Sequence, residues 1–119
     1  MKQNIKIIIA GGCGFIGSSL ANFFLSKYLK SKIYILDNLM RQGSEVNLKR
    51  LYNDRLVFIE GDLSDKTTFN KLPICDIFID AAADPSVLSG INSPVLKLIN
   101  NNFISTLNAI EWCAKTKCK

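Results

Sequence analysis

The sequence contains no histidine, and this excludes every mechanism that needs an imidazole as a general base, a metal ligand or a member of a catalytic triad. The four cysteines form no CxxC pair and show no zinc-ligand spacing. We therefore expect reduced thiols and no metal site. Cys13, which lies between two glycines, is interpreted as a small residue that fills space.

Long apolar runs are also lacking, since none approaches the roughly 20 residues that a membrane-spanning helix needs. The chain starts with a short apolar segment that leads into glycines rather than into a cleavage site, so we expect a cytoplasmic protein without a membrane partner. The net charge is +5, but the lysines are scattered and lack the interleaved aromatics of a nucleic-acid surface. We expect no nucleic-acid partner. A basic protein that binds nucleic acid is the weakest of the three functions considered for this chain.

Short apolar runs and helical patterns alternate along the whole chain. The runs predict strands at residues 5–10, 32–36, 56–60 and 76–80, and the helical patterns cover residues 15–29, 44–52, 66–71 and 95–117. Parallel strands need crossover connections of a dozen or more residues, which this alternation supplies. The expected fold is α/β, a Rossmann-type doubly wound parallel sheet with strand order 3-2-1-4, in one domain over residues 1–119.

Two of the expected helices carry an apolar stripe at helical spacing. The stripe of the first helix, expected to pack on the sheet, comprises Ile16, Leu20, Phe23, Phe24 and Tyr28. The stripe of the last helix comprises Leu96, Ile99, Phe103, Leu107, Ile110 and Ala114.

A glycine loop, GGCGFIG at residues 11–17, connects the first strand to the first helix. Gly11, Gly14 and Gly17 fit the demands of a tight turn, a close approach of phosphate to backbone, and close packing of helix on sheet. The amides at the start of the helix, near Phe15 and Ile16, would then face a pyrophosphate. The loop predicts a dinucleotide site.

Asp37 ends the second strand, 20 residues after Gly17, where a carboxylate can accept hydrogen bonds from the adenosine ribose and repel a 2′-phosphate. This spacing favours NAD over NADP, although Arg41 lies four residues further on. The alternative interpretation is a glycine-rich turn and an aspartate that merely ends a strand. Asp62 ends the third strand, where it could bond the adenine amino group or serve equally well as a turn or N-cap residue.

These segments together resemble the extended short-chain dehydrogenase/reductase family, specifically its NAD-dependent nucleotide-sugar epimerases and dehydratases. The segments that carry the resemblance are GGCGFIG at 11–17, DNL at 37–39, GDL at 61–63, Ala81, Ala82 and Ala83, and NFISTLN at 102–108 followed by Glu111. The resemblance implies that Asp37 lies at the adenosine ribose, Asp62 and Leu63 around adenine, and the three alanines along the pyrophosphate and nicotinamide ribose. Asn38 and Arg41 are further candidate cofactor-binding residues. It also implies that Asn102 supports the active site from the last helix.

The segment from Asp37 to Leu48 is similar to the corresponding loop of the CDP-paratose (CDP-tyvelose) 2-epimerase branch. The chain departs from the family pattern at two positions. Asp80 stands where relatives often have histidine, and Ser105 stands where the family usually has a glycine before Thr106.

The family's catalytic tyrosine and lysine, spaced YxxxK, lie beyond the part that this chain resembles, so no catalytic residue is named. The one YxxxK in the chain, Tyr28 to Lys32, closes the first helix at the far end of the sheet from the expected ligands. We therefore expect the NAD-binding portion of an epimerase or dehydratase that would meet a nucleotide-sugar only in a longer form. The second alternative is a stand-alone NAD-binding regulatory module. Strand four would be an open edge and the last helix would be uncovered, which predicts a homo-oligomer.

Overall fold

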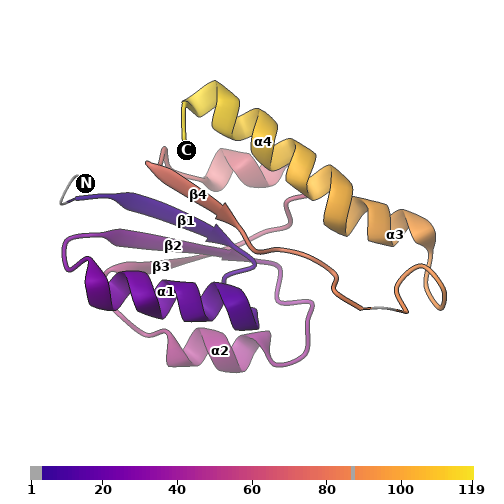
Figure 1. Ribbon diagram of the computed structural model, residues 1–119, viewed down its shortest axis with the longest axis horizontal. Helices are drawn as coiled ribbons and strands as arrows, with labels where there is room; N and C mark the ends of the chain where they lie inside the picture. Colours follow the sequence, from indigo (N-terminus) through magenta and orange to yellow (C-terminus); the bar gives the residue numbers. More distant parts are fainter. Residues whose placement is uncertain (1–3, 87) are drawn as a thin grey trace.

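The computed structural model describes residues 4–86 and 88–119, and within them four parallel strands form the centre of the fold (Figure 1). The strands are β1 (Lys6–Ala10), β2 (Lys32–Asp37), β3 (Leu56–Glu60) and β4 (Ile77–Asp80). Their order is β3-β2-β1-β4, and each neighbouring pair is parallel. The predicted fold class and strand order are confirmed.

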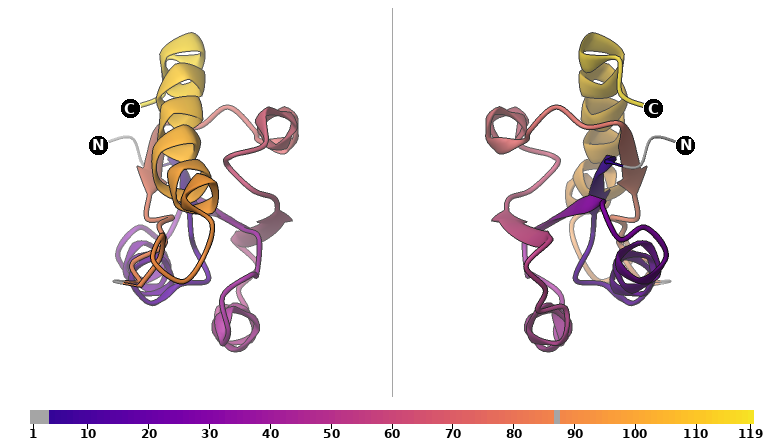
Figure 2. Two further views of the ribbon diagram at one scale, coloured as in Figure 1. Left: turned by 90° about the vertical axis from the view of Figure 1, so that its right-hand side faces the viewer. Right: turned by 90° about the vertical axis from the view of Figure 1, so that its left-hand side faces the viewer.

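Helices cover both faces of the sheet, which the end-on views of Figure 2 display as two layers. On one face lie α1 (Phe15–Lys27) and α2 (Ser44–Arg50), and on the other lie the 3-10 helix η1 (Lys66–Lys71) and α4 (Ser105–Thr116). Each helix begins where the sequence pattern predicts, apart from α4, which continues a longer helical run described below.

The core follows the alternation of side chains along β1. Ile7 and Ile9 contribute to the cluster under α1, whereas Ile8 belongs to the cluster beneath η1 and α4, and all three side chains are fully buried. A strand that is buried on both faces must be apolar at every position, which explains the uninterrupted isoleucines.

The face of α1 that packs on the sheet differs from the expected one. Its buried positions are Gly17, Ala21 and Leu25, with Leu20, Phe24 and Tyr28 partly buried beside them. Ile16 and Phe23 are 63% and 48% exposed, so the prediction that they pack on the sheet is wrong. The face of α1 that carries the small residues is turned toward the sheet, because Gly17 lies directly against the backbone of Gly11 and Gly12.

The carboxyl end of α1 is fixed by a side chain from the turn before β3. The Arg55 guanidinium donates hydrogen bonds to the carbonyl oxygens of Leu25 at 2.7 Å and Tyr28 at 3.0 Å. These are carbonyls of the last turn, which have no partner within the helix. The helix ends at Lys27, two residues earlier than the sequence pattern suggests.

The last helical run extends past the carboxyl ends of the strands (Figure 1). It consists of α3 (Val95–Ile99), a π-helical turn η2 (Asn100–Ile104) and α4, and we call the whole run, residues 95–116, the helical arm. The predicted helix over residues 95–117 is present, with a widened turn in its middle. The expected apolar stripe faces outward, and Leu96, Phe103 and Ile110 are each more than 60% exposed.

The outer edge of β4 is partly occupied. The Lys119 carbonyl accepts a hydrogen bond from Phe78 N–H at 2.7 Å, and the Lys119 amide donates to the carbonyl of Asp76 at 3.2 Å. The expectation of an open edge is therefore wrong for the first half of this strand. Beside this contact, the Sγ atoms of Cys75 and Cys118 lie 2.7 Å apart, and none of the four cysteines, all within the described residues, forms a disulfide.

Candidate functional site

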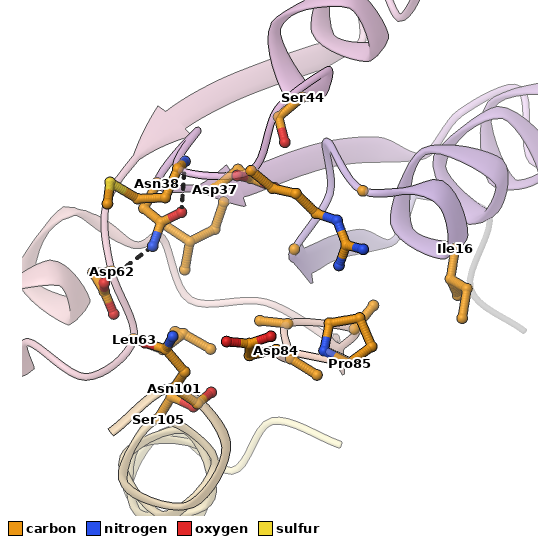
Figure 3. Close-up of a pocket in the computed structure, with 18 of the residues that line it drawn as sticks. Ile16, Asp37, Asn38, Ser44, Asp62, Leu63, Asp84, Pro85, Asn101 and Ser105 are labelled. Atoms are coloured by element: carbon orange, nitrogen blue, oxygen red, sulfur yellow. Dashed lines mark hydrogen bonds between the residues drawn. The ribbon is translucent and has the colours of Figure 1, made fainter. Parts of the chain in front are cut away.

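A cleft of about 620 Å³ opens at the carboxyl edge of the sheet (Figure 3). In doubly wound folds, ligands bind outside the carboxyl ends of the strands, and every strand of this sheet contributes the segment that follows it. The lining comes from the glycine loop, from residues 36–44, 61–63 and 81–86, and from Lys97, Asn101 and Ser105 of the helical arm.

Most residues predicted to contact a dinucleotide line this cleft. They are Gly11, Gly14, Phe15, Ile16, Asp37, Asn38, Arg41, Asp62, Leu63, Ala81, Ala82 and Ala83. Gly17 and Asn102 do not line it. Gly17 is buried beneath the loop, and Asn102 is an exposed residue of η2.

The glycine loop turns sharply out of β1 and runs against the segment that follows β4. Gly11 has a φ of 67°, and a Cβ at this position would come within 2.7 Å of the backbone of Ala81 and Ala82. The Gly14 amide donates to the Gly11 carbonyl at 3.0 Å and closes the turn. Gly11 is therefore required both for the left-handed backbone and for the close approach.

The amino end of α1 opens toward the cleft. Its first backbone hydrogen bond runs from Ser18 N–H to the Gly14 carbonyl at 3.0 Å. The amides of Phe15, Ile16 and Gly17 precede that bond, and among the described residues no hydrogen bond engages them. Phe15 and Ile16 line the cleft, and their free N–H groups at the positive end of a 13-residue helix form a cradle for an anion such as a pyrophosphate.

Asp37 is held in place by two backbone amides. Its Oδ2 accepts a hydrogen bond from Cys13 N–H of the glycine loop, and its Oδ1 accepts one from Leu39 N–H, each at 2.9 Å. The second bond supports Leu39 in the left-handed region, at a φ of 55°. Each carboxylate oxygen retains a further lone pair, so the fixed carboxylate can still accept from ribose hydroxyls.

Asp62 is the second carboxylate of the cleft, and Asn38 points toward it (Figure 3). Burial tends to raise the pKa of Asp62, but hydrogen bonds from the Ser64 amide, the Ser64 hydroxyl and the Asn38 amide outweigh burial and lower it. The Asn38 Nδ2 donates to Asp62 Oδ2 at 3.0 Å. Asp62 therefore stays ionised at neutral pH, as an acceptor that could meet an amino group.

Asn102 lies behind the cleft, where it braces the loop after β4. Its Oδ1 accepts a hydrogen bond from Asp84 N–H at 2.7 Å, and its Nδ2 donates to the Asp84 carbonyl at 3.2 Å. The pKa of Asp84 is lowered, first by the Ser89 hydroxyl and next by the Ser86 amide, with smaller contributions from Lys97 and Arg41. Asn102 thus fixes one wall of the cleft without lining it.

Several lining residues were not among the predicted site residues. Lys97, Asn101 and Ser105 lie four residues apart along the helical arm, on a polar face that complements the apolar stripe. That spacing was the signal that could have identified them. Met40, residues 84–86 and Ser44, the first residue of α2, also line the cleft, and nothing in their local pattern distinguishes them from their neighbours.

The site offers little support for metal binding or for catalysis by a cysteine or by the tyrosine–lysine pair. Within the described residues, no group of three or more His, Cys, Asp or Glu side chains could hold a metal ion. Burial, and next the charge of Asp37, raise the pKa of the Cys13 thiol to about 12, so this thiol is a poor nucleophile. Tyr28 and Lys32 lie at the opposite end of β2 from Asp37, as expected.

Comparison with known proteins matches residues 7–119 to the NAD dependent epimerase/dehydratase family. The chain belongs to this family. NAD is the family's cofactor, and the free amides, the close Gly11 turn and the fixed Asp37 carboxylate fit that group. The resemblance drawn from the sequence motifs is confirmed at the level of the family.

Two relatives that match are an epimerase and a dehydratase. CDP-paratose 2-epimerase of Salmonella typhi is 32% identical over an alignment of 111 positions that covers 90% of this chain and 32% of the relative. The dTDP-D-glucose 4,6-dehydratase of Dictyostelium discoideum is 34% identical over an alignment of 119 positions that covers 96% of this chain and 27% of the relative.

A solved structure of the family extends the match to three dimensions. UDP-glucose 4-epimerase of Thermus thermophilus, in complex with NAD, superposes with a TM-score of 0.79 at 27% identity, over 97% of this chain and 35% of the other. The chain thus spans about a third of the length of the relatives it matches. None of the helices in the described part of the chain has the length and apolar character that crossing a bilayer requires.

Proposed function

We propose that this chain is the NAD-binding portion of a nucleoside-diphosphate-sugar epimerase or dehydratase, and that its 119 residues bind NAD without carrying out the reaction. The observation that supports this proposal is the meeting of the glycine loop, the Asp37 carboxylate and the Asp62 carboxylate at one cleft. Each of the three is suited to a different part of a dinucleotide.

In this proposal the amides of Phe15 and Ile16, next to Gly14, bind the pyrophosphate. Asp37 accepts hydrogen bonds from the adenosine ribose and repels a 2′-phosphate, so NAD is preferred to NADP. Arg41 also lines the cleft and offers a positive charge to the phosphates.

The remaining lining residues serve the two ends of the cofactor. Asp62 and Leu63 contact adenine, with Asn38 holding the Asp62 carboxylate in position. The small side chains of residues 81–83 leave room along the pyrophosphate and the nicotinamide ribose, and Asn102 supports this wall through Asp84. The bound NAD supplies reversible hydride transfer, and the protein supplies orientation.

We further propose that two copies of the chain associate through the helical arm, in the cytoplasm, where its thiols stay reduced. The apolar stripe of the arm is exposed along its length, and a second copy would bury it. The nucleotide-sugar substrate would bind only to a longer form. A YxxxK pair encoded in frame after Lys119 would support this part of the proposal, and a coding sequence without one would contradict it.

The test is calorimetric titration of the chain with NAD, with NADP and with a short RNA. We expect NAD to bind more tightly than NADP, and the titration with RNA to show no saturable binding. Asp37→Ala should weaken NAD binding by about tenfold or more, because hydrogen bonds to a charged group are lost, and should narrow the preference over NADP. Asp54→Ala, an exposed carboxylate in the turn before β3, is the matched control and should leave both affinities unchanged.

Two results would contradict the proposal. A chain that ignores NAD but is saturated by RNA would refute the assignment of the cleft. Unchanged NAD affinity in the Asp37→Ala variant would mean that Asp37 only ends a strand.

A further inference from the structure

The side chain of Asn47, in α2, reaches the glycine loop although it does not line the cleft. Its Nδ2 donates a hydrogen bond to the Cys13 carbonyl at 2.9 Å, across 34 positions of sequence. The Cys13 amide donates in turn to Asp37 at 2.9 Å, and the Cys13 side chain is fully buried. The peptide groups on both sides of Cys13 are therefore held from two different elements.

The hydrogen-bond partner of the Cys13 carbonyl determines whether the first amides of α1 are free to bind a ligand. In a regular helical turn this oxygen would accept a hydrogen bond from the amide of Gly17, four residues later. Here it accepts from Asn47, and within the described residues no hydrogen bond joins it to Gly17. The backbone hydrogen bonds of α1 start only at Ser18, so the amides before it remain available to a ligand.

Helix α2, which carries Asn47, has a buried residue at each end. Leu51, directly after α2, is 2% exposed in the core under α1, and Leu48 packs against the same cluster. Ser44, at the start of α2, is 3% exposed. A side chain mounted on a packed element can hold a neighbouring loop to within a fraction of an ångström.

We propose that Asn47 is a positioning residue of the cofactor site, which sets the Cys13–Gly14 peptide and thereby directs the first amides of α1 toward the pyrophosphate. This inference rests on the proposed function, because it concerns the same ligand. Asn47 does not touch the cofactor and acts through Cys13. Its effect should therefore be confined to the phosphate part of the ligand.

The experiment compares NAD with adenosine, which lacks phosphate, as ligands of the Asn47→Ala variant. NAD affinity, measured by calorimetry, should fall about tenfold, the scale of one lost buried hydrogen bond. Adenosine affinity, measured by NMR titration, should stay within about twofold, since the ribose and adenine contacts are kept. Asn47→Gln, which retains an amide donor, should recover most of the NAD affinity. Asn22→Ala, which removes an exposed amide from α1, is the matched control and should change neither ligand.

A second measurement needs no ligand. In the unliganded chain, Asn47→Ala should shift the NMR signals and speed the hydrogen exchange of the amides of residues 14–17, whereas Asn22→Ala should not affect those of residues 14 and 15. Unmoved signals would overturn the inference whatever the affinities. Equal losses for NAD and adenosine, or a glutamine variant as weak as the alanine variant, would also overturn it and leave the proposed function standing. An unaltered chain that binds no NAD would overturn both.

Discussion

The glycine loop and the helical arm differ in how many of their surfaces contact the rest of the chain. The loop is fixed from outside itself: Asp37 and Asn47 hold Cys13, and Gly11 packs on the segment after β4. The arm is held on one face, by Ala109 and buried Asn108, while its other face leaves Phe103 and Ile110 exposed. The comparison teaches that the cleft is held in shape by contacts among the described residues, whereas those residues leave the outer face of the arm uncovered.

The largest effect should come from shortening an isoleucine in β1, the strand that leads into the glycine loop, and an isoleucine of the arm gives the comparison. Ile9→Ala removes a fully buried side chain from β1 and should lower the free energy of unfolding by about 3 kcal/mol. Ile110→Ala, 62% exposed on the arm, should change it by less than about 0.5 kcal/mol in the monomer. Urea unfolding of dilute protein, followed by circular dichroism, measures both. Similar losses for the two variants would show that the arm is already covered.

The apolar surface of the arm can be tested by placing a charge on it. Phe103→Lys should weaken self-association by about tenfold or more, because a lysine ammonium would be buried in the contact. Leu29→Lys, at an exposed position after α1, is the control and should leave association unchanged. Sedimentation velocity over a concentration series gives the dissociation constant. An unaltered chain that stays monomeric throughout the series would contradict the proposed dimer.

The thiols of the two regions should react at different rates. Burial, and next Cys118, raise the pKa of Cys113 on the arm to about 11, below the value of about 12 for Cys13. The thiolate is the reactive form, so iodoacetamide at pH 8 should modify Cys13 about tenfold more slowly, or more slowly still because of its burial. Mass spectrometry of digested protein measures the two rates. Equal rates would indicate that the loop opens readily.

The smallest effect concerns the pH dependence of stability near the loop. The pKa of Asp62 is lower in the folded chain than in the unfolded one, so its stabilisation is present above about pH 4 and is lost as the pH falls through the folded value. Asp62→Asn should therefore reduce the difference in unfolding free energy between pH 7 and pH 3. Asn38→Ala, which removes one donor to Asp62, should have part of this effect. An undiminished difference in both variants would remove Asp62 from the acid response.

The sequence was sufficient for those features that depend on local pattern. The alternation of strands and helices predicts the sheet order, and the glycine spacing with Asp37 predicts one side of the cleft. It was insufficient where contacts depend on how elements are placed. The bond from Asn47 to Cys13 and the rotation of α1 that exposes Ile16 follow from packing angles, for which no local pattern exists.

The Arg55 hydrogen bonds fix the carboxyl end of α1, and the cleft lies at the amino end of the same helix. Its 13 residues extend for about 20 Å, so a tilt of about 3° around the Arg55 end would displace Phe15 by about 1 Å. Displacements of this size are enough to disturb a preorganised site. A substitution at Arg55 would thus change the position of Phe15 from the other end of α1, without altering any residue that lines the cleft.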